Sequence, residues 1–162
     1  MTPHYIIDGY NFIHQIPKFS NAMGQSLEQA RNLLISFMKT YLSAKHIQIT
    51  LVFDGEKIGV AQAIDWSTNR LKIVFSHSPE KADPVIKQLI GKAKNKKAVI
   101  LVSADHDLIN SCKIEGAHVL SPQTFFHQLS KSMASDQLQQ KYDQEISEPE
   151  LKEWMTIFGV TK

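Results

Sequence analysis

The stretch Tyr5-Ile6-Ile7-Asp8-Gly9-Tyr10-Asn11-Phe12-Ile13 decides the fold, because an apolar run in it ends abruptly in an aspartate. Its first three residues are aromatic or β-branched, which is typical of a buried strand. The acidic group therefore lies at the carboxyl end of a predicted strand. In a parallel sheet, ligands bind outside that end of the strands.

Composition indicates one ordinary globular domain. The chain has 162 residues, of which 43% are hydrophobic and 21% are charged, and its net charge of +2 does not by itself indicate a polyanionic partner. The single cysteine, Cys112, is expected to be a buried apolar residue. Neither a membrane-spanning apolar run nor a secretory signal pattern is present, so we expect a cytoplasmic protein without a membrane partner.

Apolar runs alternate with helical patterns along the first 133 residues. The runs that predict strands are 5–7, 49–53, 71–75, 98–102 and a weaker 118–120. Helices are predicted over 26–45, 83–94, 105–115 and 121–133, and the residues after Asn11 are expected to form a loop. This alternation predicts an α/β sandwich with a mainly parallel sheet.

The end of the chain differs in character. Residues 134–146 are polar, and residues 147–159 have an amphipathic pattern with Trp154 and Phe158 on its apolar stripe. We therefore predict a domain over residues 1–133, followed by a polar linker and a C-terminal helix over residues 134–162. The stripe either packs on the domain or docks on a protein partner or a second copy of the chain.

Aspartates follow the predicted strands in a repeated way. Asp8, Asp54 and Asp105 each come just after a strand, and Asp83 opens the helix after the 71–75 strand. Two unit charges ~4 Å apart repel by about 4 kcal/mol at an effective dielectric of 20, so a cation is expected among them. The seven histidines lack the paired spacing of a zinc site. Oxygen ligands favour Mg²⁺ or Mn²⁺.

Each acid also has an ordinary structural explanation. Asp83 before Pro84 is a good helix N-cap, Asp105 and Asp107 open a helix, and Asp54 before Gly55 suits a turn. Capping does not explain why Asp8 falls at the same predicted edge.

Three segments together resemble a known family: Asp8-Gly9-Tyr10-Asn11-x-Ile13, Glu80-Lys81-Ala82-Asp83 and Ser103-Ala104-Asp105-His106-Asp107-Leu108. In this order they resemble the NYN domain family, and within it the YacP-like group, which belongs to the PIN-like nucleases. The resemblance implies a Rossmann-like three-layer α/β/α sandwich and dependence on a divalent metal. It also implies endoribonuclease activity, with RNA, free or on the ribosome, as the partner.

The resemblance also implies roles for single residues. Asp8, Asp83 and Asp105 would coordinate the metal, and Asp107 would be a secondary acid. Asn11 would be a catalytic residue that orients the first loop. Tyr10 and Lys81 flank the acids and are expected to contact substrate, as is Ser103, which would also support Asp105.

One position departs from the family pattern and keeps alternatives open. Members often have a second acid after the Ala-Asp aspartate, where this chain has Pro84, and Glu80 could replace it only if its loop reaches the site. A module that binds RNA, a ribosome or a protein without cutting is therefore the main alternative. A phospho-acceptor domain would need paired acids after the first strand, whereas here Gly9 follows Asp8.

Overall fold

The computed structural model describes residues 2–43, 45–55, 67–77 and 81–143, and side chains up to residue 137. The chain divides into two units, Met1–Gln123 and Thr124–Lys162. The predicted helix over residues 147–159 lies outside the described residues, as does Glu80. No helix among the described residues is both long and apolar enough to cross a membrane.

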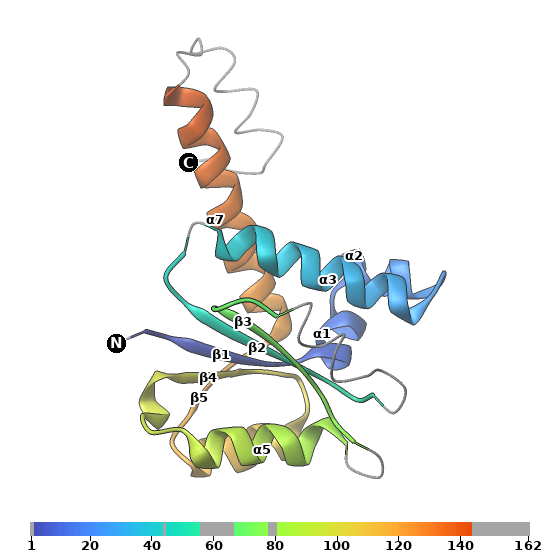
Figure 1. Cartoon of the computed structure of the whole chain (residues 1–162), viewed down its shortest axis with the longest axis vertical. Helices are drawn as coiled ribbons and strands as arrows, with labels where there is room; N and C mark the ends of the chain where they lie inside the picture. The colour runs from blue at the N-terminus through green and yellow to red at the C-terminus, as the bar shows by residue number, and fades with distance from the viewer. Residues whose placement is uncertain (1, 44, 56–66, 78–80, 144–162) are drawn as a thin grey trace. The chain divides into compact units, whose positions relative to one another are not determined.

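The first unit is built on one parallel sheet of five strands in the order β3-β2-β1-β4-β5 (Figure 1). The strands are β1 (His4–Asp8), β2 (Gln48–Phe53), β3 (Leu71–Phe75), β4 (Val99–Val102) and β5 (His118–Leu120). All five were expected from the sequence. The α/β fold with a mainly parallel sheet is therefore confirmed.

Helices cover both faces of this sheet (Figure 1). They are α1 (Gly9–Gln15), α2 (Pro17–Met23), α3 (Leu27–Leu42), α5 (Ala82–Lys92) and α6 (His106–Ile114), with a 3₁₀ turn at Lys96–Ala98. From β1 the chain moves outward to β2 and β3, and then it crosses back to β4 on the other side of β1. Because crossovers are right-handed, this reversal puts α1 to α3 on one face and α5 and α6 on the other.

The alternation of side chains along the strands divides the core between these two faces. Ile6 of β1 and Val52 of β2 belong to the cluster that packs against α5 and α6, together with Ile86 and Leu108. Successive strand residues point to opposite faces, so a residue two positions further on shares a face. Asp8 and Asp54 therefore continue the α5–α6 face beyond the end of its apolar core.

The predicted loop after Asn11 is wrong, because these residues form α1 and α2. Helix α1 begins at Gly9, directly after β1, and a Cβ there would lie 2.3 Å from the Phe53 ring. Only glycine allows the new helix to pass so close to β2. Phe12, Ile13 and Phe19 are fully buried and hold the two helices on the α3 face of the sheet.

Helix α7 (Pro122–Asp143) belongs mainly to the second unit. The sequence predicts a helix that begins at Ser121 and ends at about Met133. The helix instead continues through residues 134–143, which were expected to start the polar linker.

Candidate functional site

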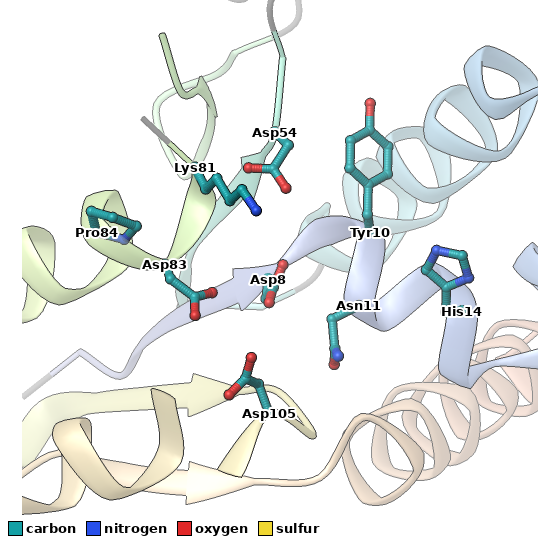
Figure 2. Close-up of a pocket in the computed structure, with 9 residues that line it drawn as sticks. All are labelled: Asp8, Tyr10, Asn11, His14, Asp54, Lys81, Asp83, Pro84 and Asp105. Carbon is teal, nitrogen blue, oxygen red and sulfur yellow. The ribbon is translucent and has the colours of Figure 1, made fainter. Parts of the chain in front are cut away.

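An open pocket of about 600 Å³ lies at the carboxyl ends of the central strands. Figure 2 shows its lining: carboxylates of four aspartates on one side, and side chains of α1 on the other. The residues are Asp8, Tyr10, Asn11, His14, Asp54, Lys81, Asp83, Pro84 and Asp105. The four aspartates that the sequence places at one sheet edge are thus brought together.

The pocket lies where the strand order reverses. Strand β1 pairs with β2 on one side and with β4 on the other, and the chain leaves these strands in opposite directions. Such a reversal leaves a crevice between the two loops at the strand ends, where open α/β sheets bind their ligands. Asp8 ends β1 and Asp105 follows β4, so these two acids flank the crevice.

The sequence explanation of Asp83 as a helix cap is wrong. Lys81, not Asp83, occupies the N-cap position of α5, and no side chain of α5 caps the helix. The orphan amide of Ala82 is instead satisfied by Asp54, whose Oδ1 accepts its N–H at 2.5 Å and lies 3.5 Å from the Ser76 hydroxyl. Asp54 therefore anchors the start of α5 from the neighbouring strand, and this leaves the Asp83 carboxylate free of a capping role.

Asp105 caps α6, as its place at the start of a predicted helix indicates. Its Oδ1 accepts the backbone N–H of Leu108 at 3.1 Å at the start of α6. The Ser103 hydroxyl accepts the N–H of Asp105 at 3.1 Å, and Ser103 is 1% exposed. Ser103 is thus placed to support Asp105, as expected, whereas the predicted contact with substrate conflicts with its burial.

Asn11, in the first turn of α1, links the two sides of the crevice. Its side-chain oxygen accepts the backbone N–H of Ala104 at 2.9 Å, across 93 residues of sequence. This hydrogen bond ties the start of α1 to the segment between β4 and α6. Asn11 therefore helps to fix the position of Asp8 relative to Asp105, whereas the sequence predicts only that it orients the first loop.

Like charges act on one another across the pocket. Burial, together with the charges of Asp83, Asp54 and Asp105, raises the pKa of Asp8 to about 7. The Asn11 backbone amide opposes this shift, although it does not form a cap hydrogen bond. Burial and then the Asp105 charge raise the pKa of Asp83, while Lys87 opposes the rise.

In the part of the chain that the structure describes, the cluster is not neutralised by a direct ion pair. Among the described residues, no lysine or arginine forms an ion pair with Asp8, Asp83 or Asp105. The Lys81 amine points toward the acids in Figure 2, at the wall opposite α1. The amino ends of α5 and α6 add favourable partial charge.

The donor set fits a hard divalent cation that keeps much of its water. Across the described residues, no three His, Cys, Asp or Glu side chains are close enough, as placed, to form a ready coordination shell. Mg²⁺ does not need one, because it is commonly held by one or two carboxylates, several waters and substrate phosphates. Four carboxylates around one open pocket match that manner of binding and not a closed zinc site.

The remaining predicted residues fall into two groups. Tyr10 and Lys81 line the pocket, as expected of substrate contacts, but Asp107 is exposed and is not part of the lining. His14 lines the pocket and was not anticipated. It lies three residues after Asn11 and four after Tyr10, so the helical period would have put all three on one face once α1 was recognised.

Comparison with known proteins places the fold. A family model described as the YacP-like NYN domain matches residues 5–157. The protein YacP of Bacillus subtilis (strain 168) is 29% identical over 115 residues, which cover 71% of this chain and 66%, just under two thirds, of that protein.

Two crystal structures of Rae1 (YacP) from Bacillus subtilis have a similar fold. The structure of a single-substitution mutant superposes with a TM-score of 0.71 and 22% identity, covering 94% of this chain and 92% of the other. A second structure gives a TM-score of 0.71 and 21% identity, covering 90% and 83%.

Proposed function

The chain belongs to the YacP-like NYN domain family, a PIN-like nuclease-type domain, and from this premise we propose that it is a divalent-metal-dependent endoribonuclease. The proposed reaction is hydrolysis of an RNA phosphodiester bond. The cofactor is Mg²⁺ or Mn²⁺, and the proposed partner is RNA, free or on the ribosome.

One observation carries this proposal: four carboxylates from separate parts of the chain meet at the reversal of strand order without a neutralising ion pair among the described residues. Burial of Asp8 and the crowding of the carboxylates both cost free energy, as the raised pKa of Asp8 indicates. A domain that only needed helix caps would not require Asp83, which caps nothing, and Asp8 occupies the N-cap position of α1 without making a side-chain cap hydrogen bond. A bound cation would relieve the repulsion.

The residues at the pocket have separate proposed roles. Asp8, Asp83 and Asp105 would hold the cation, which would neutralise phosphate charge and make water more acidic. Asn11 would hold Asp8 and Asp105 in fixed relative positions, because its side-chain oxygen accepts the backbone N–H of Ala104. Lys81 lines the pocket wall and would contact a phosphate oxygen. Water is the attacking group, its oxygen bonds to phosphorus, and the leaving ribose oxygen gains a proton when the P–O bond breaks.

A second function, an RNA-binding module that does not cut, is favoured by Pro84. This residue lines the pocket at the place where the family pattern often has a second acid. Proline is tolerated there because the first turn of α5 has amides without intrahelical partners, so the exchange costs the helix little. Weak cation binding would then leave RNA binding without cleavage.

Cleavage of end-labelled RNA in Mn²⁺ or Mg²⁺ separates the two. We expect the parent to cut internally and EDTA to stop it. Asp8→Asn and Asp83→Asn should each lose about 10²–10³ in rate, since metal assistance is worth several kcal/mol. The matched control is Glu28→Gln, which removes one negative charge from the exposed first turn of α3 and should cut at the parent rate.

Two results would count against the nuclease. Equal cleavage by the parent and both variants would exclude the acids as the catalytic group. RNA binding by a parent that never cuts, in either metal, would favour the binding module. Asp107→Asn belongs in the same series, because its exposed place outside the pocket lining predicts only a few-fold loss.

A further inference from the structure

We propose that Tyr10 is a stacking platform for one unpaired nucleobase next to the bond that is cut. This proposal rests on the proposed function for the site, and it adds a base-binding subsite and the residue that forms it. It concerns Tyr10 on the wall of the pocket opposite the acids, a residue that has no part in the proposed hydrolysis.

The Tyr10 ring is held from two sides. It packs on the Phe53 ring with the centroids 4.9 Å apart and the planes 56° apart. Its hydroxyl lies 3.3 Å from a terminal nitrogen of Arg31, which donates to it. A ring fixed in this way loses little further freedom when a ligand packs on it, which is the advantage of a preorganised contact.

The parts that hold the ring are themselves buried. Phe53 stacks on Phe75 with centroids 5.5 Å apart, and Phe53 is fully buried. Arg31 is only 7% exposed and its guanidinium lies 5.7 Å from the centre of the Phe75 ring. Burial of the Arg31 charge beside the Tyr10 hydroxyl, to which Arg31 donates, costs free energy. Arg31 is therefore assigned as the positioning residue for Tyr10.

The ring borders the same pocket as the carboxylates. Figure 2 shows Tyr10 rising from α1 with its hydroxyl directed away from Asp8 and Asp83, so the ring and not the hydroxyl adjoins the acidic side. Lys81 reaches into the pocket from the opposite wall. A strand whose phosphate meets Lys81 and the acids would have a base within the reach of Tyr10.

The chemistry of this wall selects unpaired bases. A ring can stack on a base only when the face of that base is not already covered, and bases in a duplex are covered by their neighbours. Stacking is also tolerant of sequence because every base has a π-face. Among the described lining residues, Tyr10 carries the ring that faces the acids, so a single unstacked base is what this subsite fits.

The test compares Tyr10→Leu with Tyr10→Phe, which keeps the ring and removes only the hydroxyl. Both are placed in the Asp83→Asn background so that binding is measured without cutting. The probe is an oligoribonucleotide with one 2-aminopurine, whose fluorescence falls when it stacks. We expect Tyr10→Leu to bind the single strand about 5–100-fold more weakly and to lose the quenching.

Tyr10→Phe should retain the quenching and bind within about threefold of the parent, because the contact is made by the ring. In the cleaving protein, Tyr10→Leu should raise KM for single-stranded RNA more than it lowers kcat. Duplex RNA of the same sequence should bind weakly to parent and variants alike. A parent that binds duplex as tightly as single strand, or a Tyr10→Leu that binds and quenches as the parent does, would overturn the proposal.

These results are separable from the fate of the nuclease proposal. Quenching that depends on Tyr10 in a parent that never cuts RNA would refute hydrolysis and support the base subsite. Cleavage that depends on Asp8 but is indifferent to Tyr10 and to strandedness would do the reverse. Melting temperatures of the two Tyr10 variants show whether each is folded, and only folded variants are compared.

Discussion

The amino ends of α5 and α6 both present an aspartate to the same pocket, but they use it differently. At α6, Asp105 is the N-cap and its Oδ1 accepts the Leu108 amide. At α5, Asp83 lies inside the first turn and caps nothing, while Asp54 reaches from β2 to accept the Ala82 amide. Two helix starts that look alike in sequence therefore differ in which acid satisfies the backbone.

This difference separates the four acids into two pairs. Asp54 and Asp105 each give one oxygen to an amide, so they are partly structural. Asp83 caps no helix, and Asp8, at the N-cap position of α1, makes no side-chain cap hydrogen bond; the pKa values of both are raised by burial and by neighbouring carboxylates, against the Asn11 amide at Asp8. Without a cation, Asp8 and Asp83 therefore lower the stability of the folded protein, whereas Asp54 and Asp105 contribute to it.

The largest expected effect is the pH dependence of stability through Asp8. The folded protein holds this proton up to about pH 7, whereas the unfolded chain releases it near the ordinary value of 3.8. Folding therefore favours the protonated form, and stability falls as pH rises between these values. The full shift corresponds to roughly 4 kcal/mol, of which about 3 kcal/mol falls between about pH 5 and pH 8.

Thermal unfolding in EDTA at these two pH values measures the loss. Asp8→Asn should be more stable than the parent near pH 8 and should lose much of the pH slope. Mg²⁺ or Mn²⁺ should stabilise the parent near pH 8 more than the variant, because a cation that binds only the folded state adds to its stability. A parent whose stability rises with pH over this range would contradict the assignment of Asp8 as an unsatisfied acid.

The next largest effect is expected at the start of α5, where Asp54 accepts the backbone amide of Ala82. Asp54→Ala removes the acceptor for the Ala82 amide, so the start of α5 and the position of Asp83 should loosen. Loss of a group that orients a metal ligand typically costs 10–100-fold in activity or metal affinity. Asp54→Asn keeps an oxygen in the same place and should stay within a few-fold of the parent.

The measurement is kcat/KM for RNA together with the Mn²⁺ concentration that gives half of the full rate. Asp54→Ala should raise that concentration, while Asp54→Asn should leave it nearly unchanged. If both variants lose activity equally, the charge of Asp54 matters more than its hydrogen bond. Asp54 would then belong with Asp8 and Asp83.

The sequence reveals those parts of the site that depend on local pattern. Apolar runs place the five strands, and the period of two carries Asp8 and Asp54 onto the face of Ile6 and Val52. That is enough to predict acids at one edge of a parallel sheet. The resemblance to a family adds which of them to expect at the metal.

What the sequence did not reveal depends on contacts between distant residues. Asp83 before Pro84 has the local pattern of an N-cap, and only the contact of Ala82 with Asp54, 28 residues before it, shows that the cap lies elsewhere. The loop expected after Asn11 is helical although Asp8-Gly9 has the local pattern of a turn and Asp8 makes no side-chain cap hydrogen bond. The stability of α1 comes from burial of Phe12 and Ile13 and from the close passage of Gly9 over Phe53.

The smallest effect is expected at the start of α6, where Asp105 is the N-cap. Asp105→Ala removes the cap of α6 and should cost about 1 kcal/mol of unfolding free energy, whereas asparagine is as good a cap as aspartate. In EDTA, Asp105→Ala should melt about 2–4 °C below Asp105→Asn, yet both should lose cleavage because both lack the carboxylate. At α5 the corresponding pair, Asp83→Ala and Asp83→Asn, should melt alike, since Asp83 caps nothing. A gap at Asp83 as large as that at Asp105 would mean that the two helix starts are equivalent after all, and the division of the acids into a structural and an unsatisfied pair would fail.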